Sequence, residues 1–132
     1  TKIAIIIRDD LAIWQKLNVT AFLMSGITGA NSGIVGKTYQ DWGGKRHVAM
    51  SLRPVIVLAG TANVLTNIRN RANERGVDTV AYIEEMFSTG HDYANRAVFA
   101  EHFATEANTV GIALRADKKI VDKITKGARM HG

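Results

Sequence analysis

The sequence contains no cysteine, and this absence excludes several classes of protein. Without cysteine the chain can have no disulfide, no thiolate metal ligand and no cysteine nucleophile. Long apolar runs are also absent: the most apolar stretch, IAIII at residues 3–7, is strand-sized, whereas a membrane-spanning helix needs roughly 20 residues. The sequence therefore predicts a cytoplasmic protein without a membrane segment.

Proline is scarce as well, with one residue in a chain of 132. No internal repeat, low-complexity segment or linker divides the chain, so a single domain over residues 1–132 is the simplest account. The formal net charge of +5 favours an acidic partner, with tRNA or another anionic ligand the first candidates. The alternative is mild basicity without a function.

The hydrophobic pattern predicts an α/β protein. Continuous β-branched runs such as KIAIIIR are typical of strands that are buried on both faces, and helical spacing of apolar residues predicts helices between them. The expected strands cover residues 2–8, 48–60, 77–85 and 109–115, and the expected helices begin at Asp9 or Asp10, at Thr61, at residue 97 and at Asp117. We therefore predict a three-layer α/β/α sandwich around a mixed, mostly parallel four-stranded sheet.

The first expected helix has apolar residues on most of its sides. An aspartate oxygen can accept hydrogen bonds from the free N–H groups of a first turn, so we expect Asp9 or Asp10 to begin the helix and Gly26 or Gly29 to end it. Such a helix is expected to be covered nearly all round. Apolar residues on most sides of this helix also fit a homodimer surface.

Residues 31–38, NSGIVGKT, differ from a phosphate-binding P-loop at one position, because Asn31 stands where that motif has glycine. A P-loop joins a strand directly to the helix that receives the phosphate. This octapeptide instead follows an expected helix and precedes a segment without helical periodicity. We interpret residues 29–45 as a long polar loop with room for a short hairpin.

Three segments resemble the type 2 peptidyl-tRNA hydrolases. KIAIIIRDDLAIWQKLNVTAFL is similar to that family's first strand, R-x-D-L turn and lysine-bearing helix, and IEEMFST aligns with its I-x-D-A-G-R-T segment. TVGIALRADKKIVDKITKGARMH is similar to its last strand and closing helix. The segments KLNVTAFL and TGHDYANR resemble those of an uncharacterised sister family that shares this fold.

The resemblance implies a hydrolase that cleaves the ester between a peptide and the 3′ ribose of tRNA, without metal or cofactor. Lys16 matches the family's helix lysine if one residue is dropped, Glu85 stands in place of its catalytic aspartate, and Thr89 matches its threonine. Lys16 would supply positive charge to the oxyanion, Glu85 would hold the water or accept a proton, and Thr89 would donate a hydrogen bond. Both Lys16 and Glu85 are expected beyond the carboxyl ends of strands, where ligands of open α/β sheets gather.

Further polar residues are candidates for a ligand pocket. Asn18 is the one strongly polar side chain in LNVTAFLM, and it must either tie an adjoining loop or face a ligand. His91 and Asp92 can position a base, and nearby cations can bind an anion; the alternative is a loop in which Asp92 starts a helix. No metal-ligand spacing is present there, so no metal site is predicted. The complete set of expected ligand-binding residues is Asn18, Thr20, His91, Asp92, Asn95, Arg96 and Thr109.

The last helix is rich in cations that a tRNA backbone would contact, with binding that weakens as salt rises. The residues are Arg115, Lys118, Lys119 and Lys123. An ordinary solvated helix face is the alternative interpretation.

Two functions remain open from the sequence. The first is a peptidyl-tRNA hydrolase-like esterase. The second is a catalytically silent relative that binds a small ligand or forms homo-oligomers, because the family's helix glutamine and histidine are replaced by Thr20 and Leu23 and residues 86–108 form an insertion.

Overall fold

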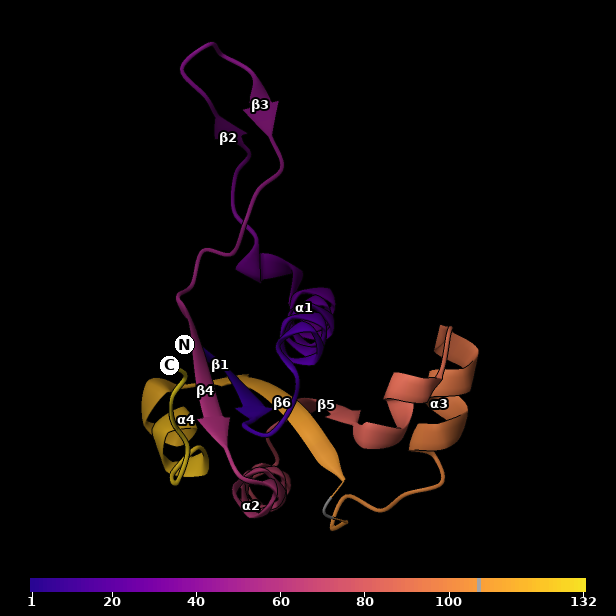
Figure 1. Cartoon of the computed structure of the whole chain (residues 1–132). Coiled ribbons are helices and arrows are strands. Elements are labelled where there is room, and N and C mark those ends of the chain that lie inside the picture. Colours follow the sequence, from indigo (N-terminus) through magenta and orange to yellow (C-terminus); the bar gives the residue numbers. More distant parts are fainter. Residues whose placement is uncertain (107) are drawn as a thin grey trace.

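The computed structural model describes residues 1–106 and 108–132, and over these it is an α/β structure built on one five-stranded sheet and a separate two-stranded hairpin. The five-stranded sheet has the order β5-β6-β1-β4-β7 (Figure 1). Its strands are β1 (Lys2–Arg8), β4 (Val55–Gly60), β5 (Thr79–Ile83), β6 (Thr109–Ala116) and β7 (Arg129–Met130).

The expected four-stranded, mostly parallel sheet is wrong. Only the pairing of β1 with β4 is parallel, while β6 runs antiparallel to both β1 and β5, and β7 runs antiparallel to β4, among the described residues. The continuous apolar run of β1 indicated a strand that is buried on both faces, which is correct, but such burial does not encode strand direction. The two-residue β7 is exposed and too short to leave a hydrophobic pattern.

Helices cover both faces of the sheet and give the expected three layers. Helix α1 (Ile13–Ala30) covers one face, and α2 (Ala62–Glu74) and α4 (Lys118–Ile124) cover the other (Figure 1). Alternate residues of β1 serve the two sides: the first core holds Ile3, Ile5 and Ile7 with Val19, Leu23 and Ile27 of α1, and the second holds Ala4 and Ile6 with Leu65, Ile68, Val121 and Ile124.

Gly111 of β6 allows α1 to approach the sheet closely. A Cβ atom at this position would lie 2.5 Å from Cγ1 of Val19 and 3.0 Å from Cδ1 of Leu23. Gly26 serves the same purpose on α1 itself, since a Cβ there would lie 2.7 Å from Cγ2 of Val80. The helix continues through both glycines that were expected to end it, Gly26 and Gly29, and ends at Ala30.

The start of α1 also differs from expectation, because neither aspartate caps it. Asp9 accepts a hydrogen bond from Arg129 at 3.1 Å and Asp10 accepts one from Arg8 at 2.6 Å. The N-cap is Ala12, whose N–H donates to the side chain of Gln15 at 3.0 Å. In contrast, the prediction for α2 is confirmed: Thr61 is its N-cap and Gly76, with a φ of 67°, follows its end.

Residues 35–54 form an arm that projects from the body beyond the end of α1 (Figure 1). Its short strands are β2 (Tyr39–Gln40) and β3 (Arg46–His47), and the 3₁₀ turn η1 (Ser32–Ile34) connects it to α1. The strand expected over residues 48–60 therefore begins only at Val55, directly after Pro54. The NSGIVGKT segment leads into this arm and not into a helix, so the loop interpretation is confirmed.

The tip of the arm is held by Asp41. Its Oδ1 accepts hydrogen bonds from the N–H groups of Gly43 and Lys45, each at 3.0 Å, and its Oδ2 lies 2.8 Å from Nε2 of His47. These bonds lie within residues 41–47, so the turn is ordered by local contacts.

The segment after β5 is helical earlier than expected. A 3₁₀ helix, η2 (Glu84–Ser88), follows β5 directly, and α3 (Asp92–Phe99) begins five residues before the helix expected over 97–107. His91 caps α3 with Nδ1, which accepts a hydrogen bond from the N–H of Ala94 at 3.2 Å. The end of the expected helix, residue 107, lies outside the described residues.

In the described part of the chain, no helix has the combination of length and apolar character needed to cross a membrane.

Candidate functional site

A cavity of about 330 Å³ lies between one flank of α1, the end of β5 and the start of α3. It brings together five of the residues that the sequence singled out, namely Asn18, Thr89, His91, Asp92 and Asn95. We call it the α1–α3 cavity. It has an aromatic wall and a polar edge.

Four aromatic side chains form the wall. Their ring centroids are separated by 6.0 Å for Trp14 and Phe87, 5.3 Å for Tyr82 and Phe87, and 5.7 Å for Phe22 and Tyr82. Burial raises the pKa of Tyr82, so its hydroxyl is neutral at physiological pH. Edge and tilted packing of this kind leaves ring faces that can stack on a planar ligand.

The polar edge is formed by the loop before α3 and by the first turn of that helix. The hydroxyl of Thr89 contacts Oδ1 of Asn95 and the carbonyl oxygen of Met86, so the NH₂ group of Asn95 is the part of that amide left for a ligand. Because Nδ1 of His91 accepts the capping hydrogen bond, a neutral His91 carries its proton on Nε2. The edge thus offers both donors and acceptors.

Asp92 and Arg96 pair along α3. Nε of Arg96 donates to Asp92 at 2.7 Å, and this hydrogen bond raises the pKa of Arg96. Both side chains are well exposed, and Arg96 is not among the residues that line the α1–α3 cavity. Helix α3 begins at Asp92, as the alternative interpretation expected, but the side chain that caps it belongs to His91. The expected anion-binding arginine lies outside the cavity.

Lys16 and Thr20 lie on the other flank of α1. They line a second cavity of about 370 Å³, whose walls are largely apolar and include Ile13, Leu17 and Val57. At 100° per residue, positions 16 and 18 of a helix point about 200° apart. The structure therefore does not bring Lys16 into one cavity with Asn18 and Thr89.

Glu85 belongs to a polar cluster at the end of β5. Its carboxylate accepts hydrogen bonds from Nδ2 of Asn108 at 3.1 and 3.3 Å, and it lies 3.7 Å from Nε2 of His102. The other ring nitrogen of His102 lies 2.6 Å from Glu106, and this contact lowers the pKa of Glu106. Glu85 lines neither the α1–α3 cavity nor the cavity beside Lys16.

Thr109 is buried and bound to Arg69. Nη1 of Arg69 donates to its hydroxyl at 3.0 Å, and burial lowers the pKa of Arg69.

Arg8, also buried, donates to Asp10 at 2.6 Å and to Glu84 at 3.3 Å. Burial acts to lower the pKa of Arg8, but the two carboxylates outweigh it and the net shift is upward.

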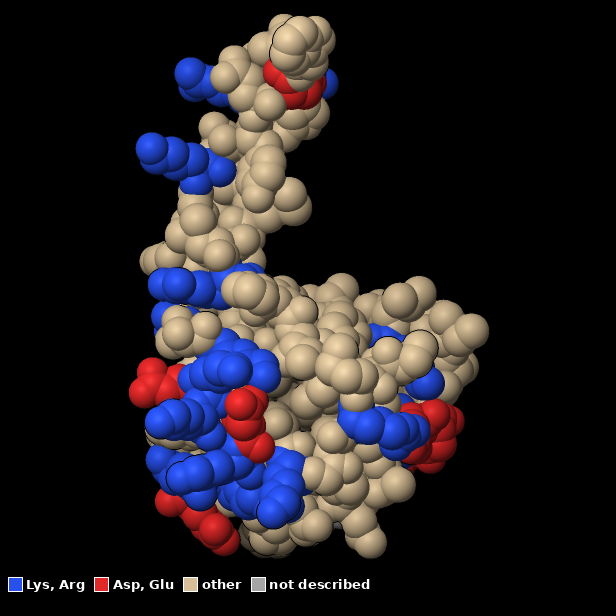
Figure 2. Space-filling model, turned by 90° about the vertical axis from the view of Figure 1, so that its left-hand side faces the viewer, with Lys and Arg blue, Asp and Glu red and all other residues tan. Residues whose placement is uncertain are grey.

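The expected tRNA-contacting cations divide between two faces of the sheet. Lys118, Lys119 and Lys123 are exposed on α4, and Figure 2 shows Lys and Arg side chains gathered on the side of the molecule where α4 and β4 lie. Arg115 lies on the α1 side of the sheet instead, where its Nη1 donates to Oδ1 of Asn31 at 3.1 Å.

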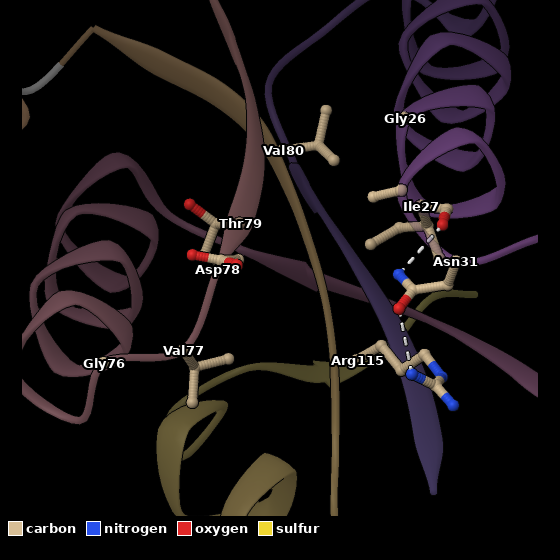
Figure 3. Close-up of a pocket in the computed structure, with 10 residues that line it drawn as sticks. Gly26, Ile27, Asn31, Gly76, Val77, Asp78, Thr79, Val80 and Arg115 are labelled. Atoms are coloured by element: carbon tan, nitrogen blue, oxygen red, sulfur yellow. Dashed lines mark hydrogen bonds between the residues drawn. The ribbon is translucent and has the colours of Figure 1, made fainter.

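Arg115 and Asn31 form one wall of a third cavity, of about 350 Å³, at the C-terminal end of α1 (Figure 3). Asp78 and Thr79 stand on the opposite wall. Nε of Arg115 is buried without a hydrogen-bond partner among the described residues. Because that atom is sealed from solvent, it does not itself offer a contact to a molecule in the cavity.

The sequence left several residues of these sites unidentified. The spacing of Trp14 and Phe22, four residues either side of Asn18, would have placed all three on one helical stripe. Arg8 could have been found as the charged end of a buried strand that two aspartates follow. No pattern predicted the contact between His102 and Glu85. Within residues 1–106 and 108–132, no group of three His, Asp or Glu residues is placed to hold a metal ion.

Comparison with known proteins gives a family and a solved structure. The model of the family described as "Protein of unknown function (DUF2000)" matches residues 1–132. A solved structure of a protein of unknown function, Atu0240 from Agrobacterium tumefaciens str. C58, is 55% identical with a TM-score of 0.97, and the match covers 99% of this chain and 97% of that one. No curated protein matches the chain.

Proposed function

The chain belongs to the family described as "Protein of unknown function (DUF2000)", and for this member we propose the binding of a small planar ligand with polar edges in the α1–α3 cavity. The observation that carries the proposal is the pairing of an aromatic wall with a polar edge in one cavity. Ligand sites are typically apolar concavities with a few polar groups that fix orientation.

The residues of this cavity define the class of ligand. Trp14 and Phe87 suit a flat ring, and Asn18 and Asn95 suit its hydrogen-bonding edge. No lysine or arginine is among the lining residues, while Asp92 is, so a neutral ring is favoured over a strongly anionic one. Nucleosides and free bases have these properties.

A thermal-shift screen followed by calorimetry tests this proposal. A ligand present at 100 times its dissociation constant stabilises the folded state by about 2.7 kcal/mol, which is a readily measured shift. Asn18→Ala is expected to weaken binding about tenfold through loss of one hydrogen bond. Asn67→Ala, an exposed asparagine on α2 behind the sheet, is the matched control and is expected to bind normally. A flat response across nucleosides, bases, sugars and carboxylates would contradict the proposal.

A second candidate is the peptidyl-tRNA hydrolase-like esterase, with the fold of that family and tRNA as partner. The supporting observation is the contact of Glu85 with Asn108 and His102, which would orient a carboxylate that holds a water or accepts a proton. Thr89 would donate to the ribose or phosphate, and Lys16, on the other flank of α1, would act through charge at longer range.

Release of tRNA from a peptidyl-tRNA mimic tests this candidate. We expect Glu85→Gln to abolish release and Lys16→Ala to reduce it, with Lys37→Ala in the arm as the matched lysine control. Both functions can be separated, because the binding proposal survives if no release occurs at any pH from about 5 to 9.

A further inference from the structure

The arm, residues 35–54, carries large apolar side chains that the body of the protein leaves uncovered. They are Tyr39, Trp42, Val48, Met50 and Leu52. Trp42 at the tip is fully exposed and Val48 is 87% exposed. Figure 2 shows the arm standing clear of the body along its length. Exposed apolar side chains that gather on one segment in this way are typical of a protein interface.

The internal contacts of the arm are few. Its strands β2 and β3 are two residues long, and an isolated bridge between Val35 and Ser51 closes its base. A two-stranded hairpin is marginally stable in water by itself. Covering its apolar side chains would stabilise it, so the arm has the character of one half of an interface.

A second apolar surface on the same chain borders a cavity beside α1. On α1, Ile13 is 76% and Leu17 is 68% exposed, and both border the largely apolar cavity of about 370 Å³ that Val57 also lines. An apolar cavity of roughly 150 Å³ already admits benzene, so this cavity has room for an indole ring.

We propose that the arm of one copy lies across α1 of a second copy, with Trp42 seated in the cavity beside Ile13 and Leu17, and that the second copy returns the same contact. The tip lies about seven residues from the base of the arm, which gives a reach of roughly 23 Å at 3.3 Å per residue. Helix α1, with 18 residues, is about 27 Å long. One arm therefore reaches over most of the helix.

A second copy is the partner that this chain itself specifies. Both halves of the contact belong to the same sequence, so a two-fold axis repeats it and closes the assembly. An aromatic side chain buries roughly 150 to 250 Å², so the two aromatic residues of each arm, together with the surfaces that they cover, reach the range of a standard interface, which is roughly 1,600 Å². The sequence pointed to α1 as a dimer surface, and the arm supplies what covers it.

RNA is the competing partner, because the arm also carries Lys37, Lys45, Arg46 and Arg53 against Asp41. Those cations suit phosphates, and Tyr39 and Trp42 suit bases. The aliphatic side chains Val48, Met50 and Leu52 suit neither, and they continue the exposed surface toward the body. These aliphatic residues favour a protein partner.

Sedimentation velocity of the full chain over a range of concentrations tests the proposal. The wild-type chain is expected to dimerise, and Trp42→Ala is expected to raise the dimer dissociation constant about 30-fold or more, as for a central aromatic residue. Tyr93→Ala removes another exposed aromatic side chain, from α3, and is expected to leave dimerisation unchanged. Circular dichroism checks that each variant is folded. A monomer at every concentration, or a dimer whose dissociation constant is unchanged by Trp42→Ala, would overturn the proposal.

Disulfide trapping identifies the contact directly, because the natural chain has no cysteine. A mixture of two single variants, Trp42→Cys and Leu17→Cys, is expected to give a covalent dimer on oxidation that contains one of each. Replacing Leu17→Cys with Tyr93→Cys is expected to remove that product. Absence of the mixed dimer, or a monomeric protein in which Trp42→Ala weakens binding to single-stranded RNA, would refute a second copy as the partner.

Discussion

Gly111 has a role that only the folded structure reveals. Its position on β6 lies under Val19 and Leu23 of α1, so the absence of a side chain sets the distance between helix and sheet. In the sequence it is one glycine in a strand-like run, TVGIALR, and nothing in that run marks a close approach. Arg8 is comparable: its pairing with Glu84 joins residues 76 positions apart.

Gly111→Ala is expected to destabilise the protein by about 1–3 kcal/mol, the usual cost of forcing an extra carbon into a packed core. The new Cβ would meet Val19 at 2.5 Å, and α1 must shift to admit it. Urea unfolding followed by circular dichroism measures the change.

The matched control is Gly29→Ala on α1, where a Cβ meets nothing within 4 Å. This change is expected to stabilise the helix by up to about 1 kcal/mol, because alanine has the higher helix propensity. Equal effects of the two substitutions would show that the close approach at Gly111 is unimportant.

Helix ends and strand ends show which elements could be predicted from the sequence. The N-cap Thr61 and the stop Gly76 gave α2 correctly, because both signals act within one turn. Local signals failed at α1, where Asp10 binds its near neighbour Arg8 and Asp9 binds Arg129, which is close only in the fold. They failed again at α3, whose cap is His91, a residue with little general preference for that position.

Thr61→Ala is expected to lower the free energy of unfolding by about 1 kcal/mol. The hydroxyl of Thr61 accepts a hydrogen bond from the N–H of Val64 at 3.3 Å, and alanine cannot replace it. Thr61→Ser keeps the acceptor and should retain most of the stability in the same urea titration. If serine is as damaging as alanine, the cap is not the cause.

The tip of the arm is expected to loosen in acid. Hydrogen bonding, first of all with His47, lowers the pKa of Asp41 below its ordinary value of 3.8. A depressed folded pKa means that the stabilisation is fully present above pH 3.8 and is lost as the pH falls through the lower folded value. Amide hydrogen exchange of Gly43 and Lys45, followed by NMR across this pH range, measures the loss. Asp41→Asn should exchange faster at neutral pH and show little of this pH dependence.

At the scale of the whole molecule, the layers were predictable and the direction of the strands was not. The continuous apolar run of β1 predicted burial on both faces, and in the structure its alternate residues face α1 on one side and α2 and α4 on the other. The antiparallel course of β6 depends on how the chain returns after β5, and no short-range pattern encodes that route. The same limit applies to the site, since a motif placed Lys16 on α1 without indicating its flank.

The exposed lysines of α4 give a prediction about tRNA binding that concerns the whole molecule. If the α4 side contacts the tRNA backbone, replacing Lys118, Lys119 and Lys123 by alanine should weaken binding and reduce the salt dependence by up to about 0.9 per lost phosphate contact. Fluorescence anisotropy with labelled tRNA at several salt concentrations measures both. Removing Lys37, Lys45 and Arg53 from the arm makes the same change in net charge; equal losses would indicate a non-specific effect.

The pairing of β1 with β6 has a consequence for synthesis on the ribosome. Ile7 and Gly111 are partners in the sheet although 104 residues (111 − 7) separate them. At about 5–20 residues per second, the first strand waits roughly 5–20 s before its antiparallel neighbour has been translated. During that interval one hydrogen-bonding edge of an isoleucine-rich strand is open, which makes the nascent chain a natural client for chaperones that shield such edges.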